Sequence, residues 1–137
     1  MKHEVGDSLP EWIMESVSAE RMRTMAAILR DPNPVHWDRE AVAALPLGLG
    51  ERTINQGPLG LSYIINMLQA WMGPDCLRRI VMRFPKVVLD GDRVVAGGRI
   101  TALEEQDGQQ LAQCEVWLAR EGEILLEGEA SVLLRDR

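Results

Sequence analysis

The longest stretch without a charged side chain restricts the fold of this chain more than any other feature. Residues 53–74 contain no Asp, Glu, Lys or Arg, although 26% of the sequence is charged. Such a segment is typically buried on most sides. A membrane span of about 20 residues is one alternative, but four amide side chains would then lie in lipid without partners. They belong to Asn55, Gln56, Asn66 and Gln69.

The segment therefore predicts a central helix from Pro58 to about Met72, apolar around most of its circumference. Pro58 suits the first helical position, whose N–H has no acceptor within the helix. Gly73 and Pro74 are typical of residues that follow a helix. On this interpretation the chain has no membrane partner.

Length, charge and cysteine content limit the class of protein. The 137 residues are expected to form one domain, residues 1–137, with 46% hydrophobic residues to build its core. The net charge of −6 argues against nucleic acid as a partner, because nucleic acid binding needs clustered cations. Cys76 and Cys114 form no Cys-x-x-Cys pair, so we expect neither a disulfide framework nor a metal site. The first residues hold no apolar run, which predicts a cytoplasmic protein without a secretory signal.

The second half of the sequence consists of β-like runs separated by tight turns. Four runs are predicted as antiparallel strands, and a fifth strand precedes the first helix. They are residues 11–17, 77–88, 93–103, 110–120 and 123–134. The turns hold Asp90-Gly91, Asp107-Gly108 and Glu121-Gly122, and Asp-Gly is a strong hairpin signal. In the last run, every second residue from Ile124 to Val132 is expected to share one face.

A meander of four such strands has an apolar face that another element must cover. Only the central helix is long and apolar enough to cover it. The sequence therefore predicts an α+β fold in which an antiparallel sheet wraps around one buried helix, which is the hot-dog architecture. Exposed edge strands of such a sheet favour pairing with a second chain, so we expect a dimer.

A shorter helix is predicted upstream of a turn that contains two prolines. Ser18 is a suitable N-cap, and the helix is expected to run through Arg30. Its packing face would hold Met22, Met25, Ala26 and Leu29. Pro32 and Pro34 prevent the helix from continuing.

The turn at these prolines carries the residues with the most catalytic potential. His36 is the only histidine outside the N-terminal segment, where His3 is expected to fray. The rigid turn can bring Asp31 and His36 together, and a carboxylate and an imidazole that share one water form an acid/base pair. Asp-Pro and Asn-Pro are also ordinary turn dipeptides, so the residues alone leave a purely structural turn open.

The sequence of this turn resembles that of a known family. Residues 31–38 read Asp-Pro-Asn-Pro-Val-His-Trp-Asp, which is similar to the Asp-x-Asn-Pro-aliphatic-His-x-Asp signature of the MaoC-like (R)-specific enoyl-CoA hydratases. Three further segments are similar to segments of the family and occur in the same order along the chain. They are residues 5–10, 54–57 and 84–94. The resemblance therefore covers nearly the whole chain.

This resemblance implies a hot-dog enzyme, usually dimeric, that adds water to a trans-2-enoyl thioester to give an (R)-3-hydroxyacyl product, or runs the reverse dehydration. Asp31 would be the general base, and His36 would hold the same water and pass a proton to C2. The backbone N–H of Gly57, at the start of the buried helix, would stabilise the thioester oxygen. A plain helix cap is the alternative role for Gly57. No cofactor is expected, and the substrate is a thioester of coenzyme A or of acyl carrier protein.

Six further residues are candidates for contacts with the rest of the substrate. Asn33, whose first role is to fix the turn, and Gln56 lie close to the catalytic candidates in the sequence. The basic candidates for the phosphates of coenzyme A are Arg78, Arg79, Arg83 and Lys86. A solvated strand face is the alternative interpretation of these four residues.

Two residues depart from the family's pattern. Arg30 stands where the family usually has Gly before the catalytic Asp, and Gln56 stands where it usually has His before the helix Gly. If that Gly serves a positive φ, Arg30 would cost about 1 kcal/mol, and the turn would be shaped differently. The substrate preference stays open for this reason.

Two other functions are also compatible with the sequence. Hot-dog thioesterases commonly carry an Asp or Glu on the central helix, and residues 58–72 hold no carboxylate, which disfavours hydrolysis. The chain could instead be a noncatalytic or partner-dependent subunit of a heteromeric hydratase, for example one for a bulky steroid-type acyl-CoA. The presence of both Asp31 and His36 favours the catalytic function, in a homodimer or with a second hot-dog chain.

Overall fold

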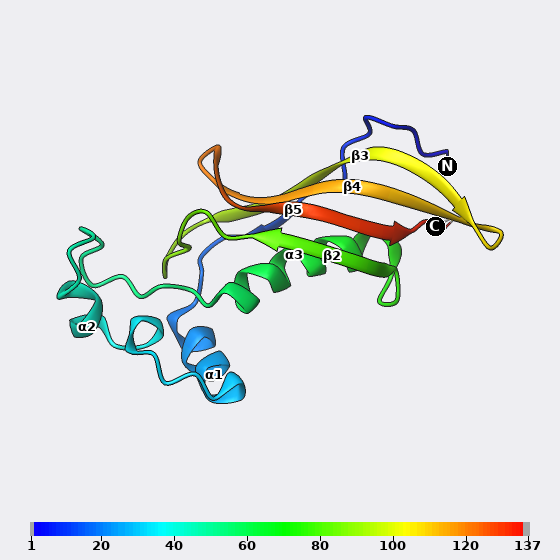
Figure 1. Cartoon of the computed structure of the whole chain (residues 1–137). Helices are drawn as coiled ribbons and strands as arrows, with labels where there is room; N and C mark the ends of the chain where they lie inside the picture. The colour runs from blue at the N-terminus through cyan, green and yellow to red at the C-terminus, as the bar shows by residue number, and fades with distance from the viewer. Residues whose placement is uncertain (1, 136–137) are drawn as a thin grey trace.

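The computed structural model of the chain describes residues 2–135. Within them, five strands form one antiparallel sheet that arches over a long helix, and two shorter helices lie beyond the N-terminal end of that helix (Figure 1). The strands are β1 (Trp12–Met14), β2 (Leu77–Arg83), β3 (Val94–Gln106), β4 (Gln109–Arg120) and β5 (Glu123–Leu133). The helices are α1 (Ala19–Leu29), the 3-10 turn η1 (Pro34–His36), α2 (Arg39–Ala43) and α3 (Gly57–Met72).

The order of the strands, β1-β3-β4-β5-β2, confirms an antiparallel sheet and corrects the expected meander of four strands. β3, β4 and β5 follow one another, whereas β2 lies beyond β5 at the edge. Asp90-Gly91 therefore does not form a hairpin, because β2 and β3 are not neighbours. Asp107-Gly108 and Glu121-Gly122 do form hairpins, and both residues of each pair have a positive φ, as the tight type I′ turn requires.

The predicted central helix is confirmed as α3. Its buried side chains pack against the inner faces of the strands and form the hydrophobic core. They include Leu59, Tyr63, Ile64, Met67, Leu68 and Met72. The helix begins at Gly57 rather than Pro58, with Gln56 as its N-cap residue. Within residues 2–135, no helix is long and apolar enough to cross a membrane.

Two predicted strands are too long, and one predicted face is partly wrong. β1 has only three residues, and β2 ends at Arg83, immediately before a segment that contains Pro85, a residue without an N–H for the ladder. In β5, Leu118 pairs with Leu126 while Ala119 pairs with Ile124, so Leu125 is an extra residue in a bulge. Leu125 is buried and Ile124 is exposed, contrary to the simple alternation predicted for this strand.

α1 follows its predicted bounds closely. The Ser18 hydroxyl accepts a hydrogen bond from the N–H of Arg21 at 3.2 Å, which confirms the N-cap. Met22 is fully buried, but Leu29 is 43% exposed, because the C-terminal end of α1 lies away from the sheet. Arg30 follows with φ 52° and ψ 41°, the left-handed geometry that commonly ends a helix at a glycine. The turn therefore has the shape that suits a glycine, and not the different shape expected for Arg30.

We expect Arg30→Gly to stabilise the folded protein by about 1 kcal/mol, because glycine adopts this φ without a clash of its Cβ. Urea unfolding monitored by circular dichroism measures the change. Arg23→Gly, at an exposed position inside the same helix, is the control and should destabilise by about 1 kcal/mol. A loss of stability in Arg30→Gly would contradict the strain at this residue.

Candidate active site

The structure brings the predicted pair Asp31 and His36 together. Nε2 of His36 lies 3.3 Å from Oδ2 of Asp31. The His36 side chain is 12% exposed and the Asp31 side chain 36% exposed, so the pair lies at the surface with the imidazole more deeply set. The prolines turn the chain as predicted: Asp31 immediately follows α1 and its C-cap Arg30, and His36 ends η1.

Short-range hydrogen bonds fix the turn between the two side chains. Oδ1 of Asp31 accepts from the N–H of Asn33 at 3.1 Å, which leaves Oδ2 to face the imidazole. Oδ1 of Asn33 accepts from the N–H of Val35 at 3.3 Å and caps η1. This bond agrees with the turn-fixing role that the sequence suggests for Asn33. The indole of Trp37 donates to the carbonyl of Pro32 at 3.4 Å and closes the turn from outside.

A backbone carbonyl sets the orientation of the imidazole. Nδ1 of His36 lies 2.7 Å from the carbonyl oxygen of Ile54. A carbonyl can only accept, so Nδ1 carries a proton in this geometry. Nε2 is therefore the nitrogen available for chemistry, and it is the one that faces Asp31. A carboxylate oxygen and a bare ring nitrogen would repel at this distance, so a proton shared between Nε2 and Oδ2 satisfies both atoms.

Residues 54–57 connect the Asp31 and His36 pair to the start of α3. Ile54 lies three residues before Gly57 and its N–H donates to Val35 at 2.8 Å. Gly57 lines a small cavity of about 140 Å³ together with Ile54, Gln56, Phe84 and Leu126, among others. As the first residue of α3, Gly57 has an N–H without an intrahelical acceptor, and no other acceptor contacts it within residues 2–135. This amide can therefore donate to an oxygen bound in the cavity.

The cavity at Gly57 and the space beside Asp31 are separate in the isolated chain. Asp31 borders a shallow hollow with Arg30, Pro32 and the end of α1, and neither Asp31 nor His36 lines the cavity at Gly57. Within residues 2–135, the expected cavity between the pair and the amide is therefore replaced by these two separate spaces. Ile54 connects the two spaces, because its carbonyl contacts His36 and its chain continues to Gly57 three residues later.

Gln56, the second departure from the family's pattern, is buried with 2% exposure. Its Nε2 donates to the carbonyl of Met22 at 2.7 Å and so ties the start of α3 to α1. Its Oε1 has no hydrogen-bond partner within residues 2–135, and neither does Oδ1 of the preceding Asn55. Both residues line the cavity at Gly57. The cavity therefore offers one free donor, and two buried side-chain acceptors without partners belong to residues that line it.

The four basic candidates fall into two groups. Arg78 and Arg79 lie at the start of β2, close to the C-terminal end of α3 and away from the pair. Lys86 lines the cavity at Gly57, whereas Arg83, at the end of β2, lines a different hollow with residues of β3, β4 and β5. Each is engaged by a glutamate, Arg83 by Glu129 at 3.4 Å and Lys86 by Glu123 at 2.8 Å. Both are more than half exposed, so these ion pairs can open for a phosphate at little cost.

A buried acidic pair, Asp90 and Asp92, lies in the segment between β2 and β3 for which the sequence predicted only a turn. Asp90 and Asp92 are 9% and 4% exposed. Asp92 binds Arg52 and Arg120, the latter at 2.6 Å, while Asp90 binds Thr53 and Arg39. The signal in the sequence is an Asp-Gly-Asp run beside apolar residues, where free carboxylates would be costly. The distant arginines that complete the network gave no local signal.

Neither cysteine is suited to nucleophilic chemistry. Cys76 and Cys114 are buried, and burial raises the pKa of both thiols, that of Cys114 to about 12. A thiol with such a pKa holds almost no reactive thiolate at neutral pH. α3 carries no carboxylate, as the sequence already shows. The Asp31 and His36 pair is therefore the better candidate for acid/base chemistry.

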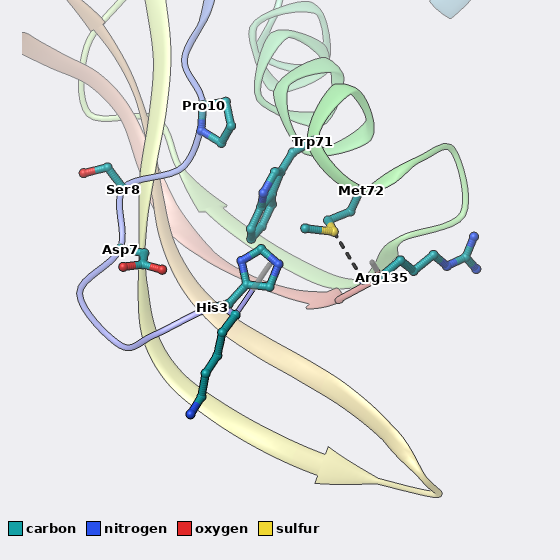
Figure 2. A pocket seen from close by; sticks show the side chains of 8 residues that line it. His3, Asp7, Ser8, Pro10, Trp71, Met72 and Arg135 are labelled. Carbon is teal, nitrogen blue, oxygen red and sulfur yellow. Dashed lines mark hydrogen bonds between the residues drawn. The ribbon is translucent and has the colours of Figure 1, made fainter. Parts of the chain in front are cut away.

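A second hollow lies at the opposite end of α3 (Figure 2). It has a volume of about 370 Å³ and lies between the N-terminal segment and the last turn of the helix. His3 contacts the Trp71 indole edge-on, with 5.7 Å between the ring centroids, so His3 is packed rather than frayed as the sequence suggested. This hollow contains none of the predicted site residues.

The sequence profile of the MaoC like domain matches residues 4–119. The chain belongs to the MaoC-like dehydratase family. The matched residues include the Asp31 to His36 turn, all of α3, β1 to β3, and all of β4 except its last residue. A comparison with curated proteins gave no match.

Solved structures of MaoC-like proteins share this fold. The (R)-hydratase from A. caviae involved in PHA biosynthesis is 26% identical, with 97% of this chain and 98% of that chain covered and a TM-score of 0.81. R-hydratase PhaJ1 from Pseudomonas aeruginosa is 21% identical, with 98% and 84% covered and a TM-score of 0.83. A chain of the ChsH1-ChsH2 complex from Mycobacterium tuberculosis is 19% identical, with 98% and 100% covered and a TM-score of 0.80. These structures confirm the predicted α+β hot-dog fold.

Proposed function

We propose that this MaoC-like protein catalyses the reversible hydration of trans-2-enoyl thioesters to (R)-3-hydroxyacyl thioesters. The observation that carries the proposal is the contact of Asp31 with Nε2 of His36, while Nδ1 is fixed by Ile54. A carboxylate and an oriented imidazole at hydrogen-bonding range can together remove a proton from water and deliver another to carbon. The family membership and the likeness to two structures named (R)-hydratases support the same chemistry.

In the hydration direction, the reaction begins with Asp31 ionised and His36 protonated on both nitrogens. A water bound beside the pair, in contact with both side chains, attacks C3 of the enoyl group, and Asp31 takes its proton. The proton on Nε2 passes to C2, which leaves a neutral imidazole beside a carboxylic acid. The 3.3 Å contact then lets the proton return from Asp31 to Nε2, which restores the starting state. No metal or organic cofactor is needed for these steps.

Negative charge accumulates on the thioester oxygen as water attacks C3. The free N–H of Gly57, at the positive end of a buried helix, is the donor proposed for that oxygen. The carrier arm shared by coenzyme A and acyl carrier protein would enter through the cavity lined by Asn55 and Gln56. Arg83 and Lys86 are the proposed contacts for the phosphates that follow this arm.

The test is hydration by the purified chain, measured as loss of the absorbance of the conjugated thioester. Short, medium and ring-bearing enoyl-CoA substrates are compared, together with acyl carrier protein forms. We expect at least one substrate to give turnover with kcat of about 1 per second or more. Absence of turnover with every substrate would contradict the function for the chain alone.

A second candidate function is that of a subunit that needs a different hot-dog chain. The specific observation in its favour is that, among residues 2–135, Asp31 and Gly57 border two separate spaces. Exposed apolar side chains also surround the turn, with Ile28 69%, Leu29 43% and Trp37 46% exposed. A partner packed on this surface would enclose Asp31. Light scattering during size-exclusion chromatography distinguishes a homodimer from a monomer that lacks its partner.

A further inference from the structure

We propose that Asp90 is a positioning residue for His36, acting through Thr53 and the carbonyl of Ile54. The inference rests on the proposed function for its effect on catalysis, but its effect on the imidazole can be measured independently. Asp90 lies in the loop between β2 and β3, far from the turn in sequence. It does not contact His36 directly, and its influence passes through the extended segment of residues 53–55.

Asp90 binds Thr53 through both its carboxylate and its backbone N–H. Oδ2 of Asp90 accepts the backbone N–H of Thr53 at 2.6 Å and its hydroxyl at 2.7 Å. The backbone N–H of Asp90 in turn donates to the carbonyl of Thr53 at 2.9 Å. Three hydrogen bonds thus hold one residue, and all of them are buried or nearly so. Buried bonds to a carboxylate are among the strongest in proteins.

The residue after Thr53 is the one whose backbone carbonyl orients the imidazole of His36. Ile54, next to Thr53, donates its N–H to Val35 at 2.8 Å and presents its carbonyl to Nδ1 of His36 at 2.7 Å. Asn55 then donates to the carbonyl of Val88 at 2.7 Å. Residues 53–55 therefore form a short bridge between the loop of Asp90 and the turn of His36. A shift of Thr53 moves the carbonyl that decides which ring nitrogen carries the proton.

Asp90 and its neighbour Asp92 have different hydrogen-bond partners. Asp92 is at least as buried, but its carboxylate binds the side chains of Arg52 and Arg120 and the N–H of Leu89. It makes no contact with the backbone of residues 53–55. Removal of either carboxylate leaves buried donors unpaired, so both losses destabilise the fold. Only the loss of Asp90 frees the segment that orients His36.

The experiment measures the protonation of His36 by 15N NMR of the imidazole. The background is His3→Gln, because the chain has two histidines and His36 is then the only one. In that parent we expect the neutral ring to carry its proton on Nδ1. Asp90→Ala should shift the signals towards a mixture with the Nε2–H form. Asp90→Asn keeps an oxygen for the two Thr53 donors and should retain the parent spectrum, as should Asp92→Ala.

The same variants are assayed for hydration. We expect Asp90→Ala to lower kcat by about 10-fold or more with KM changed by less than about 3-fold, because a misplaced catalytic group costs rate rather than binding. Asp92→Ala should keep kcat within about 3-fold of the parent at a temperature below its own unfolding transition. If Asp90→Ala does not fold, Thr53→Val and Thr53→Ser replace it. The valine variant loses the hydroxyl bond and should show part of the effect, and the serine variant should restore it.

Two results would overturn the inference. One is an unchanged His36 spectrum and kcat in Asp90→Ala. The other is an equal shift of the His36 signals and an equal decrease of kcat in Asp92→Ala, which would mean that any change in the acidic loop has the same effect on His36. The NMR result is informative even if no thioester is hydrated: a spectrum that responds to Asp90 supports the positioning role while the proposed reaction fails.

Discussion

Asp31→Asn and His36→Ala are each expected to lower kcat by at least about 100-fold, as loss of a general base or acid typically does. The asparagine can still accept the N–H of Asn33 at the position of Oδ1, so the turn is retained, but it cannot take a proton from water. The alanine removes both the Nε2 proton and the bond to Ile54. Hydration kinetics measure the loss, and circular dichroism measures retention of the fold.

A matched control for this prediction lies in the same turn. Asp38 caps α2 by accepting the N–H groups of Glu40 and Ala41 at 3.0 and 3.3 Å. Asn is as good an N-cap as Asp, so Asp38→Asn should leave the free energy of unfolding unchanged. Its kcat should stay within about 3-fold of the parent. Wild-type rates in Asp31→Asn, or an equal loss in Asp38→Asn, would remove Asp31 from the proposed mechanism.

The parts of the fold that depend on local signals could be predicted from the sequence. The absence of charge in residues 53–74 identified α3, and Ser18 identified the start of α1. Asp107-Gly108 and Glu121-Gly122 identified two hairpins. Each of these signals acts between residues that are close in the chain. The prediction of a four-strand meander was wrong because β2 pairs with β5, and no local sequence pattern predicts such long-range pairing.

In the candidate site, too, contacts between residues close in the sequence could be predicted, and contacts between distant residues could not. The prolines allowed the contact of Asp31 and His36 to be predicted, since they restrict a short loop to few conformations. The carbonyl that orients His36 lies 18 residues further along the chain, and Asp90 lies 54 residues beyond His36. Any backbone carbonyl can serve such a purpose, so the sequence carries no mark of it. The short helix α2 was also missed, although Asp38 is a good N-cap.

Replacing Gly57 by proline is expected to lower kcat/KM by about 100-fold, because it removes the only N–H proposed to stabilise the thioester oxygen. The change suits the backbone. Gly57 is the first residue of α3, where proline is favoured. Gln56 before it has φ −62° and ψ 144°, the extended geometry that a residue before proline prefers. The measurement is kcat/KM for the best substrate of the hydration panel.

Pro58 complicates the comparison, because a side chain at residue 57 would clash with the proline ring that follows it in a helix. The variants are therefore made in a Pro58→Ala background. There, Gly57→Ala keeps the amide N–H and adds a Cβ that would lie 3.3 Å from Cε1 of Phe84. Phe84 is 50% exposed and can move aside, so this control should lose less than about 10-fold. Equal losses in the alanine and proline variants would indicate a steric role for Gly57, and the proposed oxyanion donor would then have to lie elsewhere.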